Sequence, residues 1–214
     1  MVAGAPHHVT QRGNRRQRTF FRESDYSDYL RLMAEWCSKV GIEVWAYGLM
    51  PNHVHLIATP QTEDGLARAI GEAHRRYTRM INFREGWRGY LWQGRFASFV
   101  MDDVHLVACA RYVEMNPVRA GLAARPEEWP WSSARAHLAG EDDALVKVRP
   151  LLDKVLYGWD DFLSLAAPGS EADFFRRHER TGRPLGDSDF VSGVEARLGR
   201  TLVPQKPGPK NEHG

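Results

Sequence analysis

The sequence has little cysteine and no long apolar run, and each shortage argues against a class of protein. Cys37 and Cys109 both fall in apolar helical patterns, where buried free thiols are ordinary, so a disulfide framework is not indicated. No segment reaches the run of about 18 apolar residues that a membrane helix needs. The N-terminus also lacks the charged-then-apolar order of a signal peptide. We therefore expect a cytoplasmic protein with no membrane partner.

Nucleotide-binding loops are also missing. The sequence contains neither the glycine-rich P-loop nor the dinucleotide fingerprint G-x-G-x-x-G. An acidic triad of the kind that two-metal nucleases use is not visible either. The sequence therefore predicts no nucleotide cofactor and no chemistry driven by ATP.

The net charge is only +2, but the charges are unevenly distributed. Residues 1–125 contain 17 Lys and Arg against 12 Asp and Glu, whereas residues 126–214 contain 12 against 15. Almost all the cations of the first part are arginines, whose planar guanidinium suits phosphates and base edges. An arginine-rich proteome would give the same bias. The placement of the arginines is therefore more informative than their number.

Hydrophobic periodicity predicts a β-α-β-β-α-β order in the first hundred residues. Apolar residues recur at helical spacing over 25–40 and 64–83, and a further helix is expected over 104–115. The predicted strands are 8–12, 43–49, 54–58 and 96–100. This is the order of the ferredoxin-like split β-α-β arrangement. We expect an α+β fold, an antiparallel sheet with helices on one face, followed by a helical C-terminal extension.

The predicted domains are 1–125, which carries the chemistry below, and 126–214. In the second part, helical patterns cover 159–180 and 188–198. The Trp129-Pro130-Trp131 segment and the following serines Ser132 and Ser133 are expected to staple and cap another helix. Lys206 to Lys210 is expected to be a flexible basic tail.

His53 and His55 form the first candidate site. They flank Val54 in the segment MPNHVHLIA, which is predicted to be a strand. Alternate strand side chains point to the same face, so the two imidazoles can share one cation. Imidazole ligands by themselves favour a soft metal such as Zn²⁺ or Mn²⁺. The alternative is a pair of structural histidines.

Tyr112 and Asn116 form the second candidate site. They are four residues apart in ARYVEMNPVRAGL, on a predicted helix, and so share one face. A phenol with a pKa of about 10 is a poor nucleophile and needs a nearby cation or base. The alternative is a half-buried tyrosine with a packing role.

Four segments, in order and at their spacing, resemble the HUH single-tyrosine transposases (IS200-like), most closely the REP-associated tyrosine transposases. They are HHVTQRGNRRQRTFF at 7–21, MPNHVHLIATP at 50–60, LWQGRFASFVMD at 91–102 and RYVEMNPVRAGL at 111–122. The resemblance implies DNA transposition on single-stranded DNA hairpins. It implies that Tyr112 attacks a phosphodiester to give a 5′-phosphotyrosine and a free 3′-OH, and that the reverse attack rejoins strands.

The resemblance also implies a divalent metal, Mg²⁺ or Mn²⁺, held by His53, His55 and Asn116. Related insertion-sequence transposases often have Gln where this chain has Asn116, immediately before Pro117. Members of the family bind hairpins, so single-stranded or hairpin DNA is the expected partner. A homodimer is a further expected assembly, and the extension would either grip the hairpin or contribute to the dimer.

Two groups of arginines and one tryptophan are the candidate DNA contacts. Arginines on the solvent side of the second helix and Trp87, which can stack on bases, would contact the strand. The alternatives are an ordinary solvated helix face and core packing. The full set is Arg12, Arg15, Arg16, Arg18, Arg68, Arg75, Arg79 and Trp87.

Three hypotheses follow. The first is a metal-dependent transposase and single-strand endonuclease that acts through Tyr112. The second is a domesticated, catalytically weak DNA- or RNA-binding protein on the same fold, and the third is a zinc hydrolase that uses His53 and His55. Substitution of Tyr112 distinguishes them, because only the first needs its hydroxyl.

Overall fold

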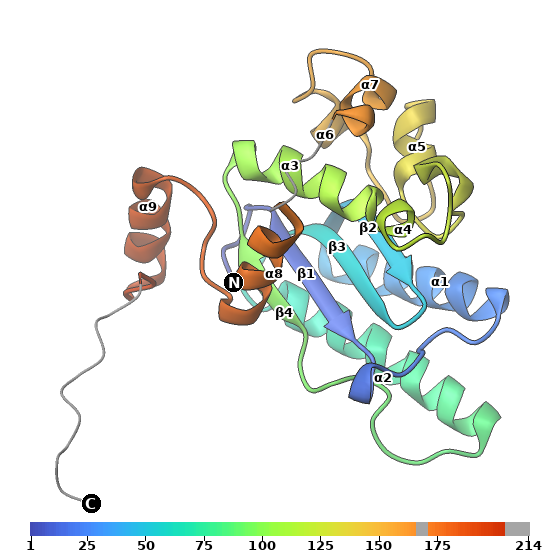
Figure 1. Cartoon of the computed structure of the whole chain (residues 1–214). Coiled ribbons are helices and arrows are strands. Elements are labelled where there is room, and N and C mark those ends of the chain that lie inside the picture. The colour runs from blue at the N-terminus through green and yellow to red at the C-terminus, as the bar shows by residue number, and fades with distance from the viewer. Residues whose placement is uncertain (166–170, 204–214) are drawn as a thin grey trace, which may run out of the picture.

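Four antiparallel strands form one sheet in the order β2-β3-β1-β4. The structure is a computed structural model that describes residues 1–165 and 171–203. The β2–β3 turn at Pro51 and Asn52 is the tight hairpin expected from the sequence. The strands are β1 (His7–Arg12), β2 (Ile42–Met50), β3 (His53–Pro60) and β4 (Ala97–Val100). They confirm the predicted ferredoxin-like order (Figure 1).

The helices α1 (Glu23–Val40) and α2 (Gly65–Glu85) cover one face of the sheet. Val9, Val54 and Leu56 of the strands pack against them in one buried cluster. The helix α3 (Asp103–Glu114) covers the opposite face, where it packs on Ile57 and Phe99. The prediction that helices cover one face of the sheet therefore holds for α1 and α2, whereas α3 forms a further layer on the opposite face.

Local sequence explains why α3 lies where it does. The Asp102 carboxylate accepts a hydrogen bond from the His105 backbone N–H at 2.9 Å, which caps the first turn. The helix ends before Pro117, and α4 (Asn116–Arg119) follows directly. Gly48 of β2 allows the close approach of α3, because a Cβ there would lie 3.1 Å from the Val113 carbonyl oxygen.

The C-terminal extension is helical, as predicted, although two details of the prediction are wrong. The helix expected over 159–180 is interrupted, since α7 ends at Ser164 and Leu165 has a non-helical backbone conformation with φ −59° and ψ 132°. Ser133 does not cap a helix, because its hydroxyl donates to Glu114 instead. The predicted basic tail lies outside the described residues. The helices are α5 (Ala134–Ala139), α6 (Arg149–Leu152), α7 (Trp159–Ser164), α8 (Glu171–Thr181) and α9 (Ser188–Leu198), with short 3₁₀ turns η1 (Asn14–Arg16) and η2 (Pro126–Glu128).

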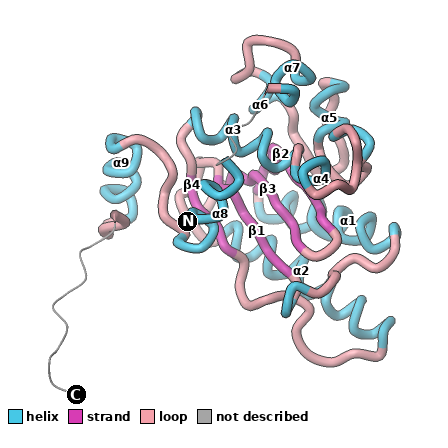
Figure 2. Tube along the Cα trace, viewed as in Figure 1, coloured by secondary structure: helices cyan, strands magenta, loops and turns pink. Residues whose placement is uncertain are grey.

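The extension packs onto the sheet at two places. Residues 131–133 and 146–147 lie beside β2, where the Leu49 N–H donates to the Trp131 carbonyl at 2.8 Å. The helix α8 crosses the α3 side of the sheet near β4 and β1 (Figure 2). Both contacts attach the extension to the sheet. The domain boundary at residue 125 stays a prediction. None of the described helices is long and apolar enough to cross a membrane.

Candidate active site

The two histidines of the MPNHVHLIA segment lie on the same face of β3, the face that α3 covers. Val54 and Leu56 point into the cluster with α1 and α2, so strand alternation places His53 and His55 on the opposite face. The centroids of their rings are 5.0 Å apart. This confirms the predicted shared face.

Tyr112 faces these histidines from α3. Its ring centroid is 5.6 Å from that of His55, and the two rings are nearly perpendicular. Tyr112 is only 3% exposed, because Phe175 of α8 packs against the ring with 5.0 Å between centroids. Arg119 also contacts Tyr112. Its guanidinium lies 4.5 Å from the centre of the ring and donates to the Tyr112 carbonyl at 2.5 Å.

The histidines are neutral, as metal ligands must be. Burial, with the nearby Arg12 and Arg176, lowers the pKa of His53 to about 3. Burial also lowers the pKa of His55 well below its usual value, and neighbouring positive groups add to the effect. The His53 Nδ1 lies 2.6 Å from the Asn52 Oδ1. His55 Nε2 is buried without a hydrogen-bond partner among the described residues. These residues fit a divalent cation that takes neutral nitrogen ligands.

Tyr112 is protonated in this arrangement. Burial raises the pKa of its phenol to about 12, and the negative charge of Glu179 adds to the increase. Arg119 and Arg176 act in the opposite direction. The phenol is therefore inert while α8 covers it, and an attack on phosphorus needs its surroundings to change.

Two further residues belong to this site that the sequence did not single out. His8 of β1 places its Nε2 at 3.0 Å from the His55 Nδ1. Glu179 of α8 places Oε1 at 3.8 Å from the His55 Nδ1 and at 4.0 Å from the His8 Nδ1. Burial raises the pKa of the Glu179 carboxyl. Single ligand atoms of these three residues lie within 4.8 Å of one another, which makes a second candidate metal cluster.

Asn116 is the first residue of α4 and is half-buried. It follows Tyr112 by four residues, across the short break at Met115. Its role as the third metal ligand stays a prediction.

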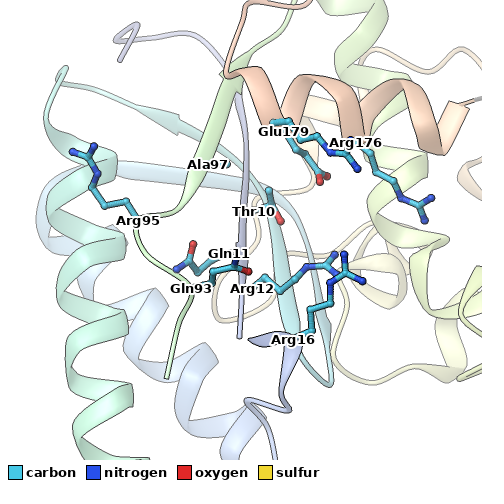
Figure 3. A pocket seen from close by; sticks show the side chains of 10 residues that line it. Thr10, Gln11, Arg12, Arg16, Gln93, Arg95, Ala97, Arg176 and Glu179 are labelled. Carbon is cyan, nitrogen blue, oxygen red and sulfur yellow. The ribbon is translucent and has the colours of Figure 1, made fainter. Parts of the chain in front are cut away.

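A cavity of about 700 Å³ opens beside the histidines, between the end of β1 and α8. Five arginines and one carboxylate line it, so it carries an excess of positive charge. Figure 3 shows the side chains of Arg12 and Arg16 close together, with Glu179 and Arg176 on the helix above them. The lining consists of Thr10, Gln11, Arg12, Arg16, Gln93, Arg95, Ala97, Arg176, Glu179 and Arg180.

The loop after β1 is held in an uncommon conformation. Arg15 and Arg16 have positive φ angles of 52° and 60°, which non-glycine residues rarely adopt. The Asn52 Nδ2 donates to the Arg16 carbonyl at 3.0 Å, which ties the loop to the turn before His53. Such local strain is common at functional sites. Arg18 follows in the same segment.

The arginines predicted on α2 lie on the other side of the sheet from the histidines. Arg75 donates to Glu72, at 2.6 Å for the shortest bond, and Arg68 pairs with Asp64 at 3.6 Å. Arg75 and Arg79 line a separate cavity of about 500 Å³. The structure therefore places Arg12 and Arg16 at the candidate active site and the α2 row away from it.

Trp87 follows the end of α2 and is 44% exposed. The edge of its ring packs on Phe21, with the centroids 5.4 Å apart. The exposed part leaves room for stacking on a base, so its predicted role in DNA binding stays a proposal.

The chain is similar in sequence to known transposases. A family model described as "Transposase IS200 like" matches residues 2–116. A Haemophilus influenzae protein assigned as a REP-associated tyrosine transposase is 26% identical over 130 residues, 55% of this chain and 74% of that protein. The REP-associated tyrosine transposase of Escherichia coli K12 is 26% identical over 98 residues, 45% of this chain and 57% of that protein.

A solved structure of a REP-associated tyrosine transposase bound to a REP hairpin has the same fold. Its TM-score to this chain is 0.57 at 20% sequence identity, and the match covers 67% of this chain and 85% of that one. The matched family segment includes both histidines, Tyr112 and Asn116. The chain belongs to the IS200-like transposase family.

Proposed function

We propose that this chain binds hairpin single-stranded DNA and cleaves and rejoins it through a 5′-phosphotyrosine intermediate. The observation that carries the proposal is the position of Tyr112, whose ring lies 5.6 Å from that of His55 on the face that also carries His53. The hairpin is chosen because the similar solved structure contains one. Such DNA is intracellular, so the proposal includes a cytoplasmic location.

Tyr112 is the nucleophile in this proposal. Its Oη forms a bond to phosphorus while the bond from phosphorus to the 3′ oxygen breaks. The phenol loses its proton, and the departing 3′ oxygen takes one up. The reverse reaction joins strands and conserves bond energy, so it needs no nucleotide cofactor.

His53 and His55 would hold one divalent cation, Mg²⁺ or Mn²⁺, with Asn116 as the third ligand. When bound, the cation polarises the scissile phosphate and lowers the charge barrier to attack. Neutral ligands leave the full charge of the cation available, and burial keeps both histidines neutral. Asn52 orients His53 through their contact at 2.6 Å.

The arginine-lined cavity would bind the phosphates of the strand that leads to Tyr112. Its excess of positive charge and its place beside the histidines support this assignment. Arg15 and Arg18 lie in the adjoining loop and extend this surface. The arginines of α2 and Trp87 are proposed to contact DNA farther from the cleavage point.

Covalent trapping tests the proposal. The purified chain is incubated with labelled hairpin DNA and Mn²⁺ or Mg²⁺, then separated on a denaturing gel. We expect an adduct that Tyr112→Phe and a chelator both abolish. Tyr157→Phe is the matched control, because Tyr157 is an exposed tyrosine away from the histidines. Light scattering of the same samples tests the predicted homodimer.

The burial of Tyr112 favours one second candidate, a catalytically weak DNA- or RNA-binding protein on the same fold. Tight binding of hairpins without any adduct would support this candidate. Metal-dependent hydrolysis that survives Tyr112→Phe and fails in His53→Ala would instead support the zinc hydrolase.

A further inference from the structure

His8 of β1 lies directly against His55 of β3. The centroids of the two rings are 5.2 Å apart, and the ring planes are nearly parallel, with an angle of 11° between them. Their facing nitrogens, His8 Nε2 and His55 Nδ1, are 3.0 Å apart. Both rings are buried, and the short distance between the two nitrogens needs one proton between them. One of the two facing nitrogens therefore donates and the other accepts.

The two possible arrangements differ at Glu179. If His55 donates from Nδ1, then His8 carries its own proton on Nδ1, which faces the Glu179 Oε1 at 4.0 Å. If His8 donates from Nε2, its Nδ1 lone pair faces that carboxylate oxygen. The first arrangement directs an N–H bond at a carboxylate, whereas the second directs a lone pair at one. Electrostatics in a buried site favours the first.

We propose that His8 is a positioning residue that holds His55 in the Nδ1–H tautomer and so keeps the His55 Nε2 lone pair available to a divalent cation. The inference rests on the proposed function, since the cation is the one assigned to His53 and His55. The His55 Nε2 is buried and has no hydrogen-bond partner among the described residues. A buried nitrogen of this kind, when it carries a lone pair, can accept a bond from a cation.

The tautomer of His53 is also set by a neighbouring side chain. The His53 Nδ1 lies 2.6 Å from the Asn52 Oδ1, and an amide oxygen only accepts hydrogen bonds. His53 therefore carries its proton on Nδ1 and leaves Nε2 bare. Both candidate ligands then present the same nitrogen, which is consistent with one shared cation.

Nitrogen NMR of the metal-free full chain, labelled with ¹⁵N-histidine, tests the tautomer directly. We expect His55 as a single Nδ1–H tautomer in the wild type and a changed or mixed tautomer in His8→Phe. His8→Gln should restore the wild-type tautomer, because its amide oxygen can accept from the His55 Nδ1. His7→Phe is the matched control, since His7 is an adjacent buried histidine whose side chain bonds the N-terminal segment instead.

Titration with Mn²⁺ gives the second readout. Loss of an orienting partner of a metal ligand typically lowers metal affinity about 10–100-fold. We expect a loss in that range for His8→Phe, a smaller one for His8→Gln and wild-type affinity for His7→Phe. Glu179→Gln should cause only a small loss, because an amide oxygen would still present negative partial charge to the His8 Nδ1, which lies 4.0 Å from the Glu179 Oε1.

Each alternative result has a distinct meaning. A His55 that carries its proton on Nε2 in the wild type, or one unaffected by His8→Phe, overturns the inference and leaves the proposed function standing. Cation binding that survives His53→Ala but is abolished in His8→Phe and Glu179→Gln would show a metal held by His8, His55 and Glu179, which also overturns it. If the wild type binds no Mn²⁺, the proposed metal site fails, and the NMR spectra still decide the tautomer.

Discussion

Asn52 connects the histidine pair, His53 and His55, to the loop after β1 that carries Arg15 and Arg16, here called the arginine loop. Its Oδ1 lies 2.6 Å from the His53 Nδ1, and its Nδ2 donates to the Arg16 carbonyl at 3.0 Å. Its own carbonyl accepts from the Gly13 N–H at 2.8 Å. A Cβ on Gly13 would collide with the Gln17 carbonyl oxygen at 2.3 Å, so the loop needs glycine there. One asparagine therefore contacts parts of both the proposed metal site and the proposed DNA surface.

Asn52→Ala should weaken both functions at once. We expect about a 10-fold loss of Mn²⁺ affinity, because His53 loses its orienting partner. We also expect weaker hairpin binding, because the loop loses the hydrogen bond from Asn52 to the Arg16 carbonyl. Metal titration and fluorescence anisotropy measure the two effects. Asn82→Ala is the control for the metal titration, since Asn82 bonds the Gly89 carbonyl away from the histidines, and an equal loss of Mn²⁺ affinity in both variants would contradict the prediction.

Arg16 and Arg75 should differ in their effect on DNA binding. Arg16 lines the cavity beside the histidines, whereas Arg75 lies on α2 and is paired with Glu72. Removing one phosphate contact lowers the slope of log affinity against log salt by about 0.7 for single strands. We expect this change for Arg16→Gln and a smaller one for Arg75→Gln, whose guanidinium is already paired with Glu72, measured by anisotropy over a salt series. The reverse order would make α2 the main phosphate track.

The helix that carries Tyr112 is clamped to the extension by a buried carboxylate. Glu114, fully buried on α3, accepts hydrogen bonds from the Ser133 hydroxyl at 2.5 Å and the Trp159 indole N–H at 2.8 Å. The His137 Nδ1 lies 2.7 Å from the same carboxylate. The position of the helix thus depends on residues that are distant in the sequence.

Glu114→Ala should destabilise the fold strongly. It leaves several buried donors unpaired and should lower the free energy of unfolding by about 3–5 kcal/mol. Urea unfolding measures this loss. Glu35→Ala serves as the control, because Glu35 lies on the surface of α1 and pairs with the exposed Lys39. A loss below about 1 kcal/mol for Glu114→Ala, the usual size of a surface change, would show that the network contributes little.

The helix α8 covers the proposed nucleophile, so weakening this cover should increase reaction. Phe175 is buried against Tyr112, and Phe175→Ala removes most of that contact. We expect a several-fold larger yield of covalent adduct at equal protein and metal. Leu165→Ala is the control, since Leu165 is an exposed apolar residue outside α8. A lower yield from a folded Phe175→Ala protein would instead show that α8 completes the reactive site.

Elements with strong local periodicity were predictable from the sequence, and contacts between distant segments were not. The apolar spacing of α1 and α2 and the alternation around His53 and His55 are local properties of the chain. The contact of His8 with His55 depends on the pairing of β1 with β3. Glu179 reaches the site only through the packing of α8. The face on which the α2 arginines lie likewise follows from tertiary packing rather than from the helix itself.

Across the whole molecule, buried neutral histidines make the fold sensitive to acid. Burial lowers the pKa of His7 to about 4 and that of His8, His53 and His74 to about 3, while His55 falls well below its usual value. The unfolded chain binds protons on these groups near pH 6.5, and the folded chain does not. Stability therefore falls as the pH decreases from 6.5 towards the folded pKa values.

We expect a sharp loss of stability between pH 7 and pH 5. At pH 5 each of the four histidines with a folded pKa of about 3 or 4 costs roughly 2 kcal/mol, and together they approach the roughly 5–15 kcal/mol that holds a typical domain folded. Urea unfolding at half-unit pH steps measures the slope. His74→Gln should flatten it by about one proton, or roughly 1.4 kcal/mol per pH unit, because its ring is removed from the titration. Stability that stays constant from pH 7 to pH 5 would mean that these histidines are not held neutral.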